Sequence, residues 1–151
     1  MLEIIVDTRE KKNHHILNYF DRNNIKYEFS TLAFGDYAAK GYENIIRIER
    51  KSGIEEITNN FTRKRNQFIN EFESALIVDC KLAVVIEDTN LNNAISHEYR
   101  SKMKPESLIA SIQAFRNRYN CSFDFISSNH MGYWIYVTLH YGINIEKKML
   151  T

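Results

Sequence analysis

Apolar residues recur along this chain in two patterns, as short β-branched runs and as longer stripes with helical spacing. The short runs predict strands at residues 2–6, 27–32, 36–39, 45–51, 81–87 and 122–126. The stripes predict helices at residues 13–23, 54–76 in two pieces, 105–119 and from Asn129 onward, with a weak helix within 90–104. Strands that alternate with helices in this way indicate an α/β fold, with a central mixed β-sheet flanked by helices on both faces.

The middle of the chain carries clear turn signals. Gly35 and Asp36 interrupt the second apolar run, and residues 41–44 separate two extended segments. We therefore predict that residues 36–51 form a hairpin or meander. The first run, which ends at Asp7, and the run at residues 81–87 are nearly continuous in apolar residues and are predicted to be buried strands.

The composition is that of one ordinary globular domain. The chain has 151 residues, of which 44% are hydrophobic and 26% charged, and its formal net charge is +1. This length predicts a single domain over residues 1–151. The balanced charge means that any nucleic-acid surface must be local. Cys80 and Cys121 are far apart and form no CxxC motif, which argues against a disulfide framework or a cysteine zinc site.

The N-terminal residues show neither a basic leader nor a small-residue cleavage site, and every apolar run is far shorter than a membrane span needs. We therefore expect a cytoplasmic protein without a membrane partner, and the Asn-, Ile- and Lys-rich composition suggests a bacterial or phage-encoded one. The sequence contains no motif for acyl transfer, nucleotide hydrolysis or dinucleotide binding.

Acidic residues gather at the predicted ends of neighbouring strands. Glu49 and Lys51 point to the same face of their strand, because alternate residues of a strand share a face. The hairpin brings Asp36 beside Glu49, and Asp7 and Glu10 lie just past the first strand. Converging carboxylates repel each other unless a cation or protons neutralise them. The predicted metal ligands, which with Lys51 form the catalytic set, are therefore Asp7, Glu10, Asp36 and Glu49.

Oxygen ligands suit Mg²⁺, with Mn²⁺ as a substitute, and such an ion supports phosphodiester hydrolysis. Lys51 would orient or help to deprotonate the attacking water, or offset charge in the transition state. Ordinary structural roles are also open. Asp7 and Glu10 fit acids at a helix N-terminus, and Glu49 with Lys51 fits an ion pair on a solvated sheet.

The order and spacing of these residues resemble a known family. A GD pair at residues 35–36 followed by ERK at residues 49–51 is similar to the signature of the XPF/Mus-type, ERCC4-domain DNA endonucleases. These structure-selective enzymes belong to the restriction-endonuclease-like PD-(D/E)xK group. Residues 6–10 resemble the family's opening strand-end motif, and Arg63 and Gln67 resemble an Arg and a Gln spaced four apart on its next helix.

The resemblance implies a restriction-endonuclease-like fold and a Mg²⁺-dependent endonuclease that cuts branched or junction DNA, such as flaps or forks. It also implies a homodimer, and a helicase or other DNA-processing protein as a further partner. The family often carries a helix-hairpin-helix domain after the nuclease domain, and we expect none here. A catalytically silent DNA-binding or dimerisation module, or a nuclease like a Holliday-junction resolvase, are the alternatives.

The residues predicted to bind DNA or to support the site are Arg9, Arg50, Glu55, Arg63 and Gln67. Arg9 can contact a phosphate or pair with a neighbouring acid. Arg50 points to the other face of its strand, where it can hold Glu55 or a helix in place or contact DNA. Glu55 stands where the family commonly has Asp. Arg63 and Gln67 can hold phosphates without reading bases, although a basic run such as 63–65 is also typical of a solvated helix face.

The last predicted helix has large apolar or aromatic residues on more than one side. Met131, Trp134 and Ile135 mark an apolar face, and Tyr133 and Tyr136 lie on the other side. One face is expected to pack in the core. Aromatic residues around the rest exceed what one contact needs, so we expect a partner surface and a homodimer.

Overall fold

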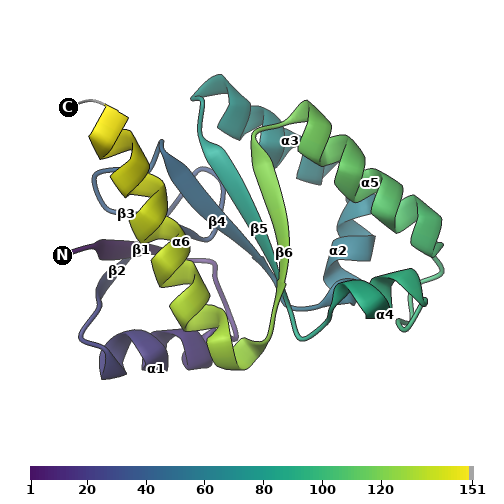
Figure 1. Cartoon of the computed structure of the whole chain (residues 1–151), viewed down its shortest axis with the longest axis horizontal. Coiled ribbons are helices and arrows are strands. Elements are labelled where there is room, and N and C mark those ends of the chain that lie inside the picture. The colour runs from purple at the N-terminus through teal and green to yellow at the C-terminus, as the bar shows by residue number, and fades with distance from the viewer. Residues whose placement is uncertain (150–151) are drawn as a thin grey trace.

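The structure, a computed structural model, describes residues 1–149, which form a six-stranded mixed sheet with helices on both faces (Figure 1). The strands are β1 (Glu3–Asp7), β2 (Lys26–Ser30), β3 (Tyr37–Ala39), β4 (Ile46–Lys51), β5 (Lys81–Glu87) and β6 (Cys121–Ile126). The helices are α1 (His14–Arg22), α2 (Ile54–Phe61), α3 (Arg65–Ile77), α4 (Leu91–Ile95), α5 (Pro105–Arg118) and α6 (Ser128–Met149). The predicted fold class is confirmed. The predicted domain also includes Leu150 and Thr151, which lie outside the described residues.

The strand order is β2-β1-β3-β4-β5-β6. The predicted hairpin is formed by β3 and β4, which pair antiparallel with Tyr37 opposite Ile48, and β3 also pairs antiparallel with β1. The pairs β1–β2, β4–β5 and β5–β6 are parallel. This topology brings the carboxyl ends of β1, β4, β5 and β6 to the same edge of the sheet as the start of β3. The acidic residues that follow or end these strands therefore meet at that edge.

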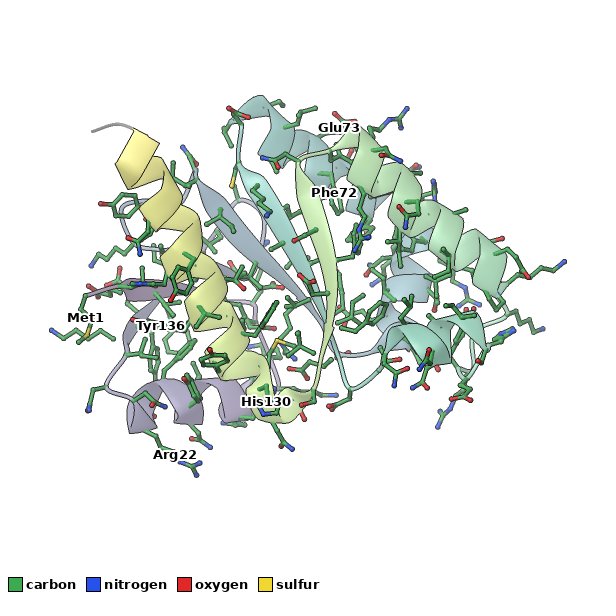
Figure 2. All side chains as sticks on the ribbon, in the orientation of Figure 1. Met1, Arg22, Phe72, Glu73, His130 and Tyr136 are labelled. Carbon is green, nitrogen blue, oxygen red and sulfur yellow. The ribbon has the colours of Figure 1, made fainter. Side chains whose placement is uncertain are left out.

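An aromatic core lies between the sheet and helices α2, α3 and α5. Phe61, Phe68, Phe72, Phe115 and Phe123 pack together there. The ring of Phe72 lies 4.9 Å from that of Phe68 and 4.9 Å from that of Phe115, both edge-on, and Figure 2 shows Phe72 on the inner side of α3. Edge-to-face pairs at this spacing add to the stabilisation from burial. This core fixes α2 and α3 beside β4.

Helices α1 and α6 cover the opposite face and lie side by side (Figure 1). Gly132 allows their close approach, because a Cβ atom there would lie only 2.6 Å from the Cβ of Tyr19. Met131 and Ile135 are fully buried against the sheet. Arg22, at the end of α1, points away from the body of the molecule (Figure 2).

The second strand is shorter than the sequence predicts. Its pairing with β1 stops where Ser30 lies opposite Asp7, and the backbone N–H of Leu32 donates to the Asp7 carboxylate at 2.8 Å. A residue that uses its N–H in this way leaves the strand ladder, so the chain turns after Ser30 instead of continuing to residue 32.

The predicted break between the two helices of residues 54–76 falls within the basic run. Arg63 and Lys64 lie in a turn and Arg65 begins α3, so these three residues do not share one helix face. The N–H of Lys64 bonds back to the carbonyl of Asn59 at 3.0 Å, which closes α2. The idea of a solvated face on a single helix is therefore wrong, as is the placement of Arg63 on the helix that carries Gln67.

Cys80 and Cys121 are both free thiols. Their distance in the sequence argues against a disulfide framework. Within the described residues, no helix combines the length and the apolar character that crossing a bilayer requires.

Candidate active site

The turn into β3 fixes Asp36 against β4. Gly35 has a φ of +76°, and a Cβ atom there would lie 3.0 Å from the Cβ of Arg47, so glycine is favoured by both conformation and space. The N–H of Asp36 donates to the carbonyl of Ile48 at 2.7 Å. Its carboxylate in turn accepts the N–H of Arg50 at 2.8 Å. These two bonds hold the Asp36 side chain beside Glu49, as the hairpin predicts.

A hollow of about 280 Å³ opens at this edge of the sheet. Its lining is strongly polar and comes from the segment after β1, the start of β3, the end of β4 and the start of α2. The lining residues are Arg9, Glu10, Lys11, Lys12, Asp36, Glu49, Arg50, Ser52 and Glu56. Three of the four predicted metal ligands are in this set, and the fourth, Asp7, is buried and does not line the hollow.

The surroundings of Asp36 disfavour its ionised form. Burial raises the pKa of Asp36 well above its ordinary value, and the charges of Glu49 and Glu10 raise it further. The hydrogen bond from Arg50 works in the other direction and is outweighed. A carboxyl group disfavoured in this way gains most from a nearby cation.

Glu49 and Lys51 form a buried ion pair, with the Lys51 ammonium 2.9 Å from Glu49 Oε1. The ammonium also lies 4.9 Å from the centre of the Phe68 ring, where the π-face attracts a cation. Burial works against the charged amine, but Glu49 outweighs it and the pKa of Lys51 is raised. Lys51 is therefore a cation at neutral pH, which favours charge stabilisation over water deprotonation.

Glu71 of α3 is a member of this group that sequence reasoning missed. It shares a hydrogen bond with Glu49, and burial together with the Glu49 charge raises the pKa of Glu71 to about 8. Its Oε2 is buried and has no hydrogen-bond partner among the described residues. The only sequence signal is its position one helical turn after Gln67, which places it on the α3 face that turns toward β4.

Asp7 is engaged by Arg9. The Arg9 guanidinium donates to Oδ2 at 2.9 Å and to Oδ1 at 3.2 Å, and Leu32 N–H adds a third bond. Burial alone would raise the pKa of Asp7, but Arg9 and these hydrogen bonds lower it below its usual value. Asp7 therefore anchors the loop after β1, and Arg9 takes the second of its two predicted roles, as the partner of an acid.

Glu10 is bound by Arg50 through two contacts, from Nε at 2.7 Å and Nη2 at 3.1 Å. Arg50 Nη1 also lies 3.2 Å from Glu87, which itself bonds His15 at 2.6 Å. These charges are almost fully buried, with side-chain exposures of 4% for Arg50, 8% for Glu10 and 7% for Glu87. Arg50 is thus a supporting residue, and its predicted partner Glu55 is not the acid it binds.

Among the described residues, no three His, Cys, Asp or Glu side chains form a group that could hold one metal ion. The four-acid metal site therefore stays a prediction. Asp7 pairs with Arg9, Glu10 with Arg50 and Glu49 with Lys51. Asp36 and Glu49 line the same hollow, and the charge of Glu49 acts on Asp36.

The remaining predicted site residues lie on α2, in the turn after it and on α3. Glu55 accepts the backbone N–H groups of Arg100 and Ser101 at 2.8 and 3.1 Å. Arg63 lines a separate hollow with Glu55, and Gln67 is exposed on the first turns of α3.

The last helix packs one side into the core, as its sequence predicts. Met131 and Ile135 are in the core, and Trp134 and Tyr136 are partly buried against it. Tyr133 is 50% exposed. The aromatic residues are thus shared between packing and surface.

The family model described as "ERCC4 domain" matches residues 6–138. The chain belongs to the ERCC4 domain family. The match spans both halves of the acidic edge, from the end of β1 to the ERK segment of β4, so this ERCC4 domain carries the GD…ERK residues on the strands where they meet in space. Among curated proteins, none matches the sequence.

Two solved structures share the fold. XPF from Aeropyrum pernix superimposes with a TM-score of 0.69 at 16% identity, covering 92% of this chain and 60% of that one. XPF from the same organism in complex with DNA gives a TM-score of 0.69 at 15% identity, covering 98% of this chain and 66% of that one. The ERCC4 domain described here therefore has the XPF nuclease fold, which is restriction-endonuclease-like, and spans less than two thirds of each of those chains.

Proposed function

We propose that this ERCC4 domain is a Mg²⁺-dependent DNA endonuclease that hydrolyses phosphodiesters in branched or junction DNA. The observation that carries the proposal is the meeting of Asp36 and Glu49 at one hollow of this fold, with the Lys51 ammonium 2.9 Å from Glu49. Two neighbouring carboxylates and a buried ammonium are the groups that hydrolysis of a phosphodiester needs.

The donor set fits a hard divalent cation. Asp36 and Glu49 offer oxygen ligands only, and Mg²⁺ is commonly bound through one or two carboxylates together with water and substrate phosphate. The raised pKa of Asp36 reflects burial and repulsion by Glu49 and Glu10, which a cation would relieve. Mg²⁺ bound there would supply an activated water and would stabilise charge on a phosphoryl oxygen.

The residues of the chain have separate tasks in this proposal. Lys51 places a fixed positive charge beside the carboxylates, where it offsets the negative charge that develops on the phosphate in the transition state. Arg50 acts through its backbone N–H, which orients Asp36, and through its side chain, which holds Glu10 at the rim of the hollow. Arg9 holds Asp7 and thereby the loop that carries Glu10.

DNA as the substrate is supported by the fold it shares with an XPF that was solved in complex with DNA. The preference for branched DNA, and a helicase or other DNA-processing partner, are inferred from the family resemblance. A silent DNA-binding module is the weaker candidate, because Asp36 and Glu49 line the same hollow and Lys51 is paired with Glu49. A resolvase-like enzyme would use the same site on four-way junctions.

We expect this ERCC4 domain to cut labelled flap, fork or four-way junction DNA in Mg²⁺ or Mn²⁺ and to leave all three intact in EDTA. The reason is that the carboxylate pair can activate water only with a bound cation. Denaturing gels of end-labelled strands measure the cleavage. Binding of these DNAs without any cutting in either metal would favour the silent module instead.

We also propose that the domain forms a homodimer. Leu76, Ile77 and Val78 at the end of α3 are 48%, 84% and 41% exposed, and Tyr141 of α6 is 65% exposed. Val78 and Tyr141 line a shared hollow of about 660 Å³. Leu76 and Ile77 precede Val78 directly, so exposed apolar groups lie in and next to this hollow, as is typical of a contact surface.

Light scattering at micromolar concentration is expected to give the mass of two chains, and Ile77→Glu is expected to give the mass of one, because it places a charge in the apolar contact. Ile95→Glu, a change of a 56% exposed apolar residue at the end of α4, serves as the control and should remain dimeric. A single-chain mass for the unchanged protein would remove this proposal and leave the nuclease site unaffected.

A further inference from the structure

A second hollow, of about 480 Å³, also borders α2. It is bounded by α2, by the turn after it and by the loop between α4 and α5. Its lining residues are Glu55, Thr58, Asn59, Thr62, Arg63, Arg100, Ser101, Lys102 and Met103. We call this hollow the basic groove.

The basic groove carries an excess of positive charge. Arg63, Arg100 and Lys102 are exposed, and none of their side chains forms an ion pair or a hydrogen bond with the side chains and backbone that the structure describes. The only acid in the lining is Glu55, and both of its oxygens accept backbone N–H groups. Three uncompensated cations around a polar hollow are a local site for an anion, in a chain whose net charge is only +1.

Glu55 shapes this groove. It receives Arg100 N–H at 2.8 Å and Ser101 N–H at 3.1 Å, which joins the loop to α2. The loop is also closed on itself, since His97 bonds the Ser101 carbonyl at 2.8 Å and Tyr99 donates to the Met103 carbonyl at 2.7 Å. The backbone that bears Arg100 and Lys102 is therefore held in one place before any ligand arrives.

Helix α2 borders both hollows. It begins three residues after Lys51, and Glu56 lines the acidic hollow while Glu55 and Asn59 line the basic groove. Glu56 and Asn59 are three residues apart and are therefore neighbours on the helix surface, so the two hollows are close to each other along α2.

We propose that the basic groove binds backbone phosphates of a DNA strand beside the scissile phosphate, with Arg63, Arg100 and Lys102 as the contacts and Glu55 as a positioning residue. The inference rests on the proposed nuclease function and extends it from the reacting phosphate to its neighbours. The exposed cations would contact phosphate oxygens and would fix the position of the strand without reading bases.

The test compares two double variants that each remove one Arg and one Lys. Arg100→Ala/Lys102→Ala removes two cations from the basic groove, and Arg22→Ala/Lys26→Ala removes exposed charges elsewhere, at the end of α1 and at the start of β2. Affinity for labelled fork DNA is measured by fluorescence anisotropy in EDTA, across a range of salt concentrations. Working without metal separates binding from cleavage.

The groove variant is expected to bind about tenfold more weakly than the unchanged protein, and the slope of log Kd against log salt is expected to fall by about 2, since each lost phosphate contact removes about 0.9. The control variant should keep the slope. Equal slopes of log Kd against log salt for the two variants would overturn the proposal that the basic groove binds DNA, whether or not the protein cuts DNA. If the groove variant shows the reduced slope but the unchanged protein never cuts DNA, the proposal for the basic groove stands and the nuclease proposal fails. If the unchanged protein does not bind DNA at all, both proposals fail.

The role of Glu55 is tested by Glu55→Gln, which removes a negative charge but leaves one oxygen where two were used. If Glu55 merely repelled DNA, the variant would bind more tightly. As a positioning residue, its loss is expected to weaken binding several-fold and to add little to Arg100→Ala/Lys102→Ala, because the three act as one unit. Tighter binding by Glu55→Gln would overturn this role.

Discussion

Replacement of Asp36 by Asn is expected to abolish DNA cleavage, by about 10³-fold or more, because the neutral amide cannot hold a divalent cation beside Glu49. The fold should be kept. The amide oxygen of Asn can still accept the N–H of Arg50, which in the unchanged protein lies 2.8 Å from the Asp36 carboxylate. Cleavage is measured as the initial rate on fork DNA in Mg²⁺.

The melting temperature of Asp36→Asn shows whether the variant loses activity without losing stability. Burial raises the pKa of Asp36, followed by the charges of Glu49 and Glu10, so the ionised form is disfavoured in the folded state. A neutral amide removes this repulsion, and the melting temperature in EDTA at neutral pH should therefore not fall. Asp79→Asn, an exposed change in a turn with a φ of 55°, serves as the matched control and should cut normally. Full activity in Asp36→Asn would defeat the mechanism.

Much of the central site could be predicted because it depends on local rules. The two-residue repeat of a strand places Glu49 and Lys51 on one face, and the 2.9 Å contact between them confirms this. The turn at Gly35 and the hairpin that follows bring Asp36 to the same edge. Neither result needs information about distant parts of the chain.

The partners of the charged groups could not be predicted in the same way. Asp7 and Glu10 each have several basic residues nearby in sequence, and only the packed structure decides that Arg9 takes the first and Arg50 the second. Glu71 follows Glu49 by 22 positions, and it reaches the site because the aromatic core holds α3 against β4. The contacts of Glu55 lie 45 and 46 residues away, in a loop without regular structure.

The pairings explain how so many charges are tolerated at one edge of a sheet. Asp7 has Arg9, Glu10 has Arg50, and Glu49 has Lys51. Asp36 has a backbone N–H in place of a cationic side chain. Among the acids that line the hollow, Asp36 alone is thus without a cationic side chain within ion-pair distance. This is the position in the hollow where a metal ion would lower the energy most.

Replacement of Arg50 by Met is expected to destabilise the domain by about 3–5 kcal/mol, because it leaves Glu10 and Glu87 buried without their cation. Their side chains are only 8% and 7% exposed, and Arg50 lies 2.7 and 3.2 Å from them. The free energy of unfolding is measured by urea denaturation at pH 7. The matched control is Lys40→Met, since Lys40 also bridges two acids, at 3.6 and 3.1 Å, but with 46% of its side chain exposed. That change should cost at most about 1 kcal/mol.

The origin of the loss is tested by adding Glu10→Gln and Glu87→Gln to Arg50→Met. If the cost comes from unpaired buried charge, neutral amides should recover a large part of it, although the bonds to Arg50 are still missing. If the cost comes from lost packing around the Arg50 side chain, the triple variant should be no more stable than Arg50→Met. A loss for Arg50→Met as small as that for Lys40→Met would show that the buried network contributes little. In that case the position of Glu10 at the rim of the hollow would depend on the backbone after β1 and on the bond between Asp7 and Arg9.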